Sequence, residues 1–516
     1  MELAVGLAAL VLRLLHNGAM MGLPLYQFPL GGHVAFLDEA ERIAGGAFVP
    51  GRPFTENSPL FPYLLAGVFF VAGGRDLLLV RLAGVAADCV TAALVTRLAT
   101  RRFGTLAGAI AGLLYAGYGP AVFFAAELIY IPYALLLCTA AVVCLTGGPP
   151  TVRRMLATGG LYGLATGFMP SLLAGVPLLA LVVGLQGREQ RVRRGVAALA
   201  GVAIAIAPVT ALNYAASGKL VLLTMSSGHA FYLGHNPQAR AGYYLPDRVG
   251  AVQAANRGSI FDSMHRIADE TAGRPMPDDE VSGFYFRKAW EHVTSEPAAE
   301  LGLAASRLAA FANWYEATTY ADFYFQREQS AWLRMLPAFS LLFVLAALGL
   351  VQGSLRRELP LLLVPLVSLA SVLAFFYLAR FRMPAVPFLC CFAGRGVAGV
   401  IEGVRERRAG RLAASALAAG LALVAASRTM VVPDTSNEWN KLGAVHLALK
   451  QYAEAETAFQ RAAAANPASP YPYLNLARLH DATGATDRAA EARAMAQAIT
   501  AGEGDGERFR RALAGQ

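Results

Sequence analysis

The chain has 516 residues, of which 56% are hydrophobic and 15% are charged. A soluble globular protein carries about a quarter charged residues, so this composition predicts that most of the chain is solvated by lipid. The formal net charge of +9 does not favour nucleic-acid binding, because the arginines gather in short loops between apolar segments. The five cysteines all lie inside apolar segments and suggest neither a disulfide framework nor a zinc site.

Eleven apolar segments are long enough, at about 20 residues each, to cross a bilayer as helices. They predict an all-α polytopic membrane protein. Residues 2–21 lack a basic leader and a small-residue cleavage site, so we expect them to remain as the first span. The other ten spans are expected at residues 78–99, 105–120, 128–146, 155–170, 171–187, 195–213, 332–352, 359–378, 384–402 and 411–431.

Arginine clusters fall at every second connection between these spans, so one orientation satisfies the positive-inside rule throughout. It is that of a multi-pass protein of the bacterial inner membrane with a cytoplasmic N-terminus. Its periplasmic parts are the loops 22–77 and 214–331 and the chain beyond residue 431. A full span at residues 59–73 would reverse every later loop, so that short run is interpreted as a helix at the outer interface. The clusters are Arg101–Arg102, Arg153–Arg154, Arg188–Arg194, Arg356–Arg357 and Arg405–Arg411.

The chain divides after the membrane domain of residues 1–431 into helical repeats at 432–503 and a polar tail at 504–516. A unit starting at Ser436 follows the tetratricopeptide pattern, and a second unit from Pro470 has Arg493 where a large apolar residue belongs. The second unit is therefore interpreted as a capping repeat. Because about three repeats are usually needed for stability, the pair is expected to lean on the membrane domain or on a partner protein. The first unit's pattern residues are Trp439, Leu442, Gly443, Ala455, Phe459, Ala462 and Pro467.

Five places in the membrane domain resemble a known family. In chain order they read FPLGGHVAFLDEAERIAGG with FTENSPLFPYLLAG, then YGPAVFFAAELIYIPY, FYLGHNPQARAGYY, NWYEATTYADFYFQREQSAWLR and LARFRMPAVPFLCCFAG. Their order and their shared periplasmic side resemble bacterial GT-C glycosyltransferases of the protein-mannosyltransferase-like and aminoarabinose-transferase-like type, some of which carry tetratricopeptide tails.

This resemblance implies that a sugar is transferred from a polyprenyl-phosphate donor to an acceptor at the outer membrane face. Such chemistry needs a carboxylate to accept a proton, cations to offset charge on the leaving phosphate, and a groove for the lipid. The sequence departs from the family at the base, because Gly32 stands where the catalytic Asp is expected. Asp38 and Glu39 are the substitute candidates. The alternative is that they form the solvated face of an interfacial helix.

Three further residues are candidates for the same site. Glu56 matches a family position that helps to bind a divalent metal, and His235 could supply a nitrogen ligand, although one Glu and one His do not define a metal site. The cofactor is therefore unknown, with a divalent metal ion as the option that the resemblance raises. Glu127 lies in an apolar stretch and is costly unless it faces a cavity, so it is either a cavity acid or a residue snorkelling at a span end.

Arg380 and Arg382 lie at the outer end of a span, where positive charge is normally scarce. They suit a bidentate grip on the donor phosphate, and the alternative is an anchor on ordinary phospholipid headgroups. In the segment before the span at 332–352, Glu316 and Asp322 are interpreted as solvated acids rather than as lining the sugar site. The aromatic residues of the same segment predict an interfacial belt: Trp314, Tyr315, Tyr320, Phe323, Tyr324 and Phe325.

Two functions remain open from the sequence. The first is a membrane glycosyltransferase that uses a polyprenyl-phosphate sugar, with the repeats recruiting an acceptor or a protein partner. The second is a catalytically silent relative that acts as a scaffold in envelope-polysaccharide assembly. Gly32 favours the scaffold, whereas Arg380, Arg382, Glu56 and Glu127 favour the enzyme. A transporter is disfavoured, because intramembrane charges are few and the two halves do not repeat.

Overall fold

The computed structural model describes residues 1–54, 58–186, 190–256, 259–427, 431 and 433–500. Within these residues the regular structure is helical, and the one β-type contact is an isolated bridge between Gly242 and Tyr377. The chain forms two compact units. Unit 1 consists of Met1–Leu14, Phe36–Ala317 and Leu336–Met430, and unit 2 consists of Leu15–Ala35, Thr318–Met335 and Val431–Gln516.

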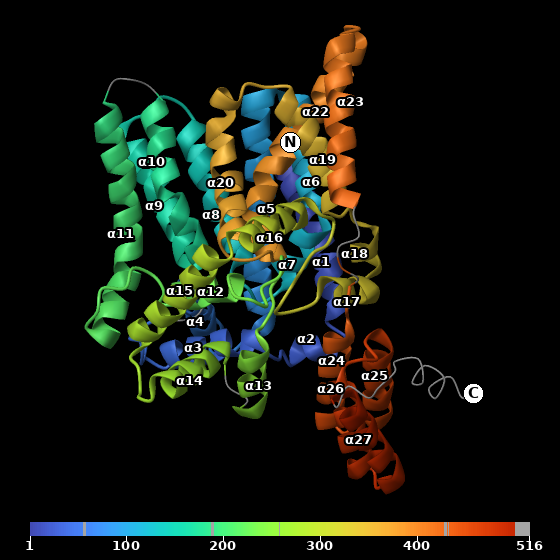
Figure 1. Cartoon of the computed structure of the whole chain (residues 1–516). Helices are drawn as coiled ribbons and strands as arrows, with labels where there is room; N and C mark the ends of the chain where they lie inside the picture. The colour runs from blue at the N-terminus through green and yellow to red at the C-terminus, as the bar shows by residue number, and fades with distance from the viewer. Residues whose placement is uncertain (55–57, 187–189, 257–258, 428–430, 432, 501–516) are drawn as a thin grey trace. The chain divides into compact units, whose positions relative to one another are not determined.

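The apolar helices run side by side as a bundle in unit 1, with the helices of the long loops gathered at one end of it (Figure 1). The apolar helices are α1 (Glu2–Met20), α4 (Leu60–Ala72), α5 (Leu77–Phe103), α6 (Thr105–Ala116), α7 (Gly119–Ala126), α8 (Ile131–Thr146), α9 (Val152–Phe168), η1 (Pro170–Gly175), α10 (Val176–Leu185), α11 (Arg191–Ser217), α19 (Phe339–Val351), α20 (Leu355–Ala374), α21 (Ala379–Arg382), η2 (Met383–Ala385), α22 (Val386–Arg405) and α23 (Ala409–Ser427). The loop helices are α3 (Gly32–Ala44), α12 (Ser227–Gly234), α13 (Asp247–Asn256), α14 (Ile260–Ala272), α15 (Asp278–Ser295) and α16 (Pro297–Ala312).

Six helices in the described residues are long and apolar enough to cross a membrane. A seventh span results if α6 and α7 are counted together, although they bend by 52° at the break between them. The bend corrects the straight span expected at residues 105–120. It lies at Gly117 and Tyr118, just before the Gly119–Pro120 step at which α7 begins, and a helix cannot continue undisturbed into a proline. Each of the eleven predicted segments contains helix, whereas a count of eleven spanning helices is not established.

Helix α4 is too short to cross a bilayer. Its 13 residues rise about 20 Å at 1.5 Å per residue, against a hydrocarbon core of about 30 Å. It ends at Gly73, which adopts a left-handed conformation with φ of 74° and closes the helix with its own N–H. This length fits the interpretation of residues 59–73 as a helix that does not span.

Two devices hold the bundle together. Small residues allow close backbone approach, because an added Cβ on Gly159 or Gly201 would collide with the backbone of the facing helix in the α9–α11 pair. A buried ion pair links α1 to α5: Arg13 Nε donates to Asp88 Oδ2 at 2.6 Å, and the Tyr115 hydroxyl from α6 donates to the same carboxylate. Charges buried in a membrane domain need such partners.

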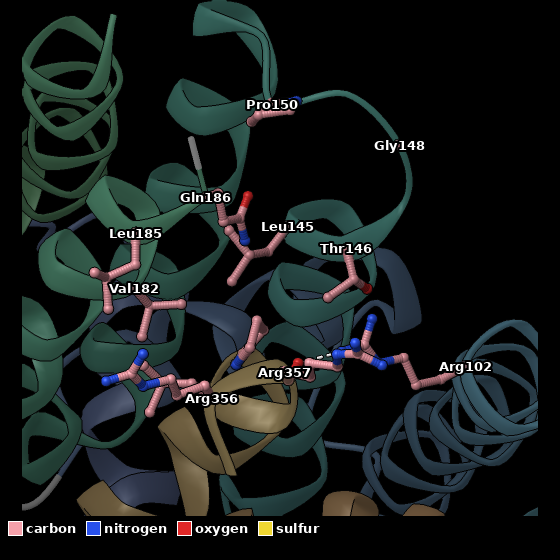
Figure 2. Close-up of a pocket in the computed structure, with 12 residues that line it drawn as sticks. Arg102, Leu145, Thr146, Gly148, Pro150, Val182, Leu185, Gln186, Arg356 and Arg357 are labelled. Carbon is pink, nitrogen blue, oxygen red and sulfur yellow. Dashed lines mark hydrogen bonds between the residues drawn. The ribbon is translucent and has the colours of Figure 1, made fainter. Parts of the chain in front are cut away.

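The predicted arginine-rich connections meet at one end of the bundle. A cavity there is lined by Arg102 at the end of α5, Thr146 at the end of α8, Gln186 after α10, and Arg356 and Arg357 at the start of α20 (Figure 2). The ends of four helices therefore share one face of unit 1, as the alternating arginine clusters predict. We call this face the basic end.

Unit 2 builds the repeats onto segments from two distant loops. Its helices are α2 (Pro24–Gln27), α17 (Phe323–Gln329), α18 (Ala331–Met335), α24 (Ser436–Ala448), α25 (Tyr452–Ala465), α26 (Pro470–Ala482) and α27 (Thr486–Thr500). Phe325 of α17 is buried edge-on against Trp439 of α24, and Leu23 and Leu25 pack on the same cluster. The prediction of an aromatic belt is therefore wrong for Phe323 and Phe325, which are each 2% exposed inside the protein.

Candidate functional site

The turn between α20 and α22 carries the ARFRMP motif and holds Arg382 rigidly. The Arg382 guanidinium is 1% exposed and pairs with Glu316 Oε2 at 2.7 Å. It also donates to the carbonyl oxygens of Phe311 at 2.9 Å and Asn313 at 2.6 Å, and lies 3.6 Å from the centre of the Phe339 ring. Because protein groups occupy this guanidinium on several sides, Arg382 fixes the turn to the end of α16.

Glu316 completes this arrangement from the far side. Its carboxylate is 1% exposed and also accepts a hydrogen bond from the Tyr118 hydroxyl at 3.0 Å, at the bend between α6 and α7. The interpretation of Glu316 as a solvated acid is therefore wrong. A buried charge is tolerated only with such partners, and sequence spacing could not reveal a partner from a different part of the chain.

Arg380 lies two residues earlier in the same turn. It is 8% exposed, and its guanidinium is 5.3 Å from the centre of the Phe381 ring. The turn is held further by Tyr377, whose N–H donates to the Ala241 carbonyl, and by Ala379, whose N–H donates to the Ala317 carbonyl. The backbone that presents Arg380 is thus anchored to the large loop on both sides.

Glu127 lies at the same end of the bundle as this turn. It is 8% exposed and follows α7 directly, before α8 begins at Ile131. Because the other end of α8 lines the cavity at the basic end, Glu127 lies towards the opposite end. The same reasoning holds for Arg380, because α22 begins beside it and Arg395, further along α22, reaches the basic end by pairing with Glu358 of α20. We call this opposite end the loop end.

His235 forms part of an internal network that docks the large loop on the loop end. Its Nδ1 faces Glu300 Oε2 at 2.7 Å and its Nε2 faces the Ala374 carbonyl at 3.0 Å. Arg307, 1% exposed, donates to the Leu373 carbonyl at 2.8 Å, and burial lowers the pKa of its guanidinium to about 10 although Glu300 opposes the shift. Both ring nitrogens of His235 therefore already have protein partners.

The described residues contain no group of three or more His, Cys, Asp and Glu side chains that could hold a metal ion. Glu56, the other residue of the predicted metal site, lies outside the described residues. A divalent metal therefore stays a prediction that rests on the sequence resemblance.

The acidic helix α3 presents its two candidate bases differently. Asp38 is exposed, and no hydrogen bond or ion pair of its carboxylate occurs within the described ranges. Glu39 makes a two-pronged pair with Arg42, with distances of 2.8 and 2.6 Å. On the same helix Glu41 pairs with Arg75 at 3.2 Å. Asp38 is therefore the acid of this helix whose oxygens are available to a substrate.

In unit 2 the ring of Tyr320 fills the space beside Gly32. A Cβ added at Gly32 would overlap the Cδ1 and Cε1 atoms of that ring. The imidazole of His33, which is 5% exposed, stacks on the same Tyr320 ring, with ring centroids 5.5 Å apart and planes at 15° to each other. The position where the family's catalytic Asp is expected is therefore occupied by an aromatic side chain from the large loop.

Asp322, two residues after Tyr320, caps the N-terminus of α17 by accepting from the Phe325 N–H at 2.7 Å. Burial raises its pKa to about 6, and the nearby carboxylate of Glu438 acts in the same direction. Glu438 itself pairs with Lys441 at 2.5 Å in α24. The interpretation of Asp322 as a solvated acid is wrong, because it is a helix cap enclosed by the first repeat.

Comparison with known families matches one part of the chain. Residues 436–479 match the tetratricopeptide repeat family. This match confirms the repeats that the residue pattern predicts from Ser436. Comparison with curated proteins finds no match to the chain.

Solved structures that resemble the chain are membrane glycosyltransferases. One is ArnT from Cupriavidus metallidurans bound to undecaprenyl phosphate, at 17% identity and a TM-score of 0.35, covering 71% of this chain and 72% of that one. Another is the Archaeoglobus fulgidus oligosaccharyltransferase tethered with an acceptor peptide, at 13% identity and a TM-score of 0.40, covering 88% of this chain and 58% of that one. Its apo form is similar at 12% identity and the same TM-score. Both proteins are GT-C enzymes, the superfamily that the five sequence segments resemble.

Proposed function

We propose that this protein is a membrane glycosyltransferase that takes a sugar from a polyprenyl-phosphate donor and transfers it to an envelope acceptor at the loop end. The observation that carries the proposal is the anchored ARFRMP turn. Arg382, paired with Glu316 and two carbonyl oxygens, holds the turn in place, and the turn carries Arg380 at the loop end of an apolar bundle. A buried arginine at such a place suits the phosphate of a lipid lying between helices.

The residues divide the work in this proposal. Arg380 binds the donor phosphate and offsets the charge that develops on it as the sugar leaves. Arg382 is a positioning residue, because its guanidinium is already occupied. Asp38 accepts the proton of the acceptor nucleophile, since its carboxylate is exposed while that of Glu39 is paired with Arg42. Glu127 lines the same end of the bundle.

Unit 2 supports a shared side of the membrane for these loops and the repeats. It joins residues 15–35, 318–335 and the chain from 431 into one compact body. We therefore expect the parts of these segments that lie outside the predicted spans to share one side of the bilayer. An even number of crossings must therefore separate these segments. The predicted spans supply six crossings between the first two segments and four between the last two, and a spanning α4 would make the first number odd. With the basic end in the cytoplasm, the repeats are periplasmic.

Donor binding and sugar transfer, measured separately on purified protein in nanodiscs, test the proposal. Arg380→Lys keeps the charge but loses the planar fork, so we expect binding of undecaprenyl phosphate to weaken about tenfold, and Arg380→Ala to weaken it further. Asp38→Asn should leave donor binding within about twofold of wild type and lower turnover on the order of 100-fold.

Matched variants separate these effects from general damage. Arg240→Lys, also in the large loop, and Glu41→Gln, on the same helix as Asp38, should change neither quantity. Arg382→Lys should lower the thermal stability of the protein, because it leaves the buried Glu316 carboxylate poorly paired. Unchanged donor affinity in folded Arg380→Ala would contradict the role of the turn.

The scaffold function has one specific observation in its favour: the ring of Tyr320 occupies the place beside Gly32. A scaffold would bind donor or partner proteins without transferring sugar. Wild-type protein that binds undecaprenyl phosphate but transfers no sugar to envelope extracts from any polyprenyl-phosphate donor would favour the scaffold. Transfer that depends on Asp38 would exclude it.

A further inference from the structure

The cavity at the basic end is a second feature of unit 1 with the chemistry of a binding site. Its volume is ≈ 340 Å³, at the lower end of the range of roughly 300–1,000 Å³ that small-molecule sites occupy. It lies among the ends of three apolar helices, α8, α10 and α20, and the end of α5 (Figure 2). In a bilayer crossed by these helices, we expect their ends, and so the cavity, to lie near the headgroups of one leaflet.

One edge of the cavity is strongly basic. Arg102, Arg356 and Arg357 lie along it in a row (Figure 2). Arg102 is held in place, since its Nε donates to Glu358 at 3.1 Å and its Nη2 donates to the Arg357 carbonyl. Glu358 is itself shared with Arg395 at 3.2 Å. Glu358, the acid beside this edge, is therefore already paired, and the lining residues that the structure describes carry a net positive charge.

The side chains of Arg356 and Arg357 supply that charge. Both residues are exposed, and neither side chain has a hydrogen bond or ion pair within the described part of the chain. They stand in the first turn of α20, where Ser354 makes no capping hydrogen bond to the free backbone N–H groups. Two arginines and the positive end of a helix therefore lie together at this edge, an arrangement that suits an anion.

Apolar residues line another part of the cavity. Leu145 of α8 and Val182 and Leu185 of α10 are among them (Figure 2). Leu359 and Pro360 also line the cavity, from the same helix as the two arginines. Leu185 is 64% exposed, so part of this apolar lining faces the surroundings of the bundle. A soluble anion would gain nothing from these side chains, whereas a lipid could pack its glycerol and first methylenes against them.

We propose that this cavity binds one anionic phospholipid of the leaflet at the basic end, with its phosphate on Arg356 and Arg357 and its chains against the exposed Leu185. The site is separate from the proposed donor site, which lies at the loop end, and it does not depend on the proposed catalytic activity. Its ligand class follows from the pairing of a cationic edge with apolar lining residues at the ends of apolar helices.

Native mass spectrometry of the full-length protein with added phosphatidylglycerol tests this site. Each arginine near a membrane surface contributes about 1 kcal/mol to the binding of an anionic lipid. The double variant Arg356→Gln with Arg357→Gln should therefore lower the affinity for the most tightly bound phosphatidylglycerol about 30-fold. Arg405→Gln removes an exposed charge from the end of α22 outside the cavity and should change that affinity less than twofold. Leu185→Gln should also lower the affinity for this lipid, because it removes apolar contact with the lipid chains.

Two further probes identify the ligand. Phosphatidylcholine carries no net charge and should bind at least tenfold more weakly than phosphatidylglycerol, and inorganic phosphate at 10 mM should not displace the lipid. Displacement by inorganic phosphate, with Leu185→Gln unaffected, would show a site for soluble anions and overturn the proposal. Equal loss of lipid in Arg405→Gln would also overturn it, because the effect would then be one of general surface charge. A melting temperature within a few degrees of wild type establishes that the double variant is folded.

Discussion

Gly32 stands where the resemblance to the family predicts a catalytic Asp, so it bears directly on whether the protein is an enzyme or a scaffold. The structure gives a steric reason for glycine there: the helix α3 begins at Gly32, and the Tyr320 ring lies where a Cβ would project. The backbone of Gly32 is not in the left-handed region that only glycine adopts readily, since the positive φ belongs to Gly31. A side chain at position 32 therefore requires Tyr320 to move.

We expect Gly32→Ala to destabilise unit 2 by roughly 1–3 kcal/mol through this overlap. Tyr320→Ala in the same chain should remove most of that cost, because the two changes act on one contact. Gly22→Ala, at a glycine with open space around it, is the matched control. Thermal unfolding of the purified protein measures the stability of these three variants and of the wild type. Equal effects of Gly22→Ala and Gly32→Ala would show that the ring does not confine position 32.

The same pair offers a test of lost catalysis. Gly32→Asp with Tyr320→Ala restores a carboxylate at the family's expected position and makes room for it. If wild-type turnover is low because that acid is missing, the double variant should gain sugar transfer at least tenfold over Tyr320→Ala alone. No gain, with Asp38→Asn still inactive, would assign the proton acceptor to Asp38.

Asp322 predicts a pH dependence with a defined sign. Its pKa is about 6 in the folded protein against 3.8 for the free side chain, because burial disfavours the carboxylate. The protonated form is therefore favoured by folding, and this contribution is complete below about pH 4 and lost as the pH rises through 6. A pKa shift of this size corresponds to a change of about 2–3 kcal/mol in the free energy of unfolding between low and neutral pH.

The measurement is urea unfolding of unit 2 between pH 4 and 7, followed by Trp439 fluorescence in a chain whose Trp290, Trp314 and Trp332 are Phe. Asp322→Asn keeps a cap acceptor for α17 but cannot titrate, so its stability should not fall over this range. Asp487→Asn, at an exposed acid of α27, should behave as wild type. A wild type that becomes more stable from pH 4 to 6 through Asp322 would reverse the sign and contradict the burial of this carboxyl.

At the residue scale the sequence could suggest candidates but not their partners. The sequence predicts a site at Arg380 and Arg382 but does not distinguish the two, because spacing does not show which one pairs with Glu316. It does not predict the Arg13–Asp88 pair either, since each of these residues is a lone charge in its own apolar helix. Pairs between distant segments follow from packing, which a single sequence does not contain.

At the scale of elements, hydrophobic runs predicted the long helices well and the breaks between them poorly. A run such as residues 78–99 has one solution in a bilayer, and α5 covers it. Residues 105–120 gave an equally apolar run, but Gly117 and the Gly119–Pro120 step bend it into α6 and α7. The bend places Tyr118 against Glu316, so the least predictable part of the run is also the part that contacts the candidate site.

The first repeat depends on Gly443. An added Cβ would come within 2.5 Å of the Phe459 ring, so the residue that faces Gly443 is Phe459, one turn after Ala455 on α25. Gly443→Leu should therefore unfold the repeats, because the helices α24 and α25 can no longer approach. The membrane helices should remain inserted.

Limited proteolysis of membranes measures this effect as faster cleavage within residues 436–500. Ala453→Leu adds the same side chain to an exposed position of α25 and should leave cleavage unchanged. Equal resistance of Gly443→Leu and Ala453→Leu would contradict the packing of α24 on Phe459.

At the scale of the whole chain, the alternating arginine clusters and the three-segment composition of unit 2 lead to the same parity of crossings. A tag after Gln516 should therefore be cleaved by protease added to spheroplasts, whereas a tag between Arg188 and Arg194 should be protected until the membrane is opened. Protection of both tags would place the repeats in the cytoplasm and remove the sidedness on which the proposed donor site depends.

The composition of unit 2 also has a consequence for how the protein is made. Leu23 and Leu25 leave the ribosome near the start of synthesis, but Trp439 and Leu442, their neighbours in the same cluster, follow some 400 residues later. At 5–20 residues per second, that interval is roughly 20–80 s, during which the early leucines and later Phe325 lack their final cover. The repeat helices, which are translated last, therefore cover apolar residues that are translated first. A chain that ends early is left with exposed apolar residues, which chaperones and proteases of that compartment recognise.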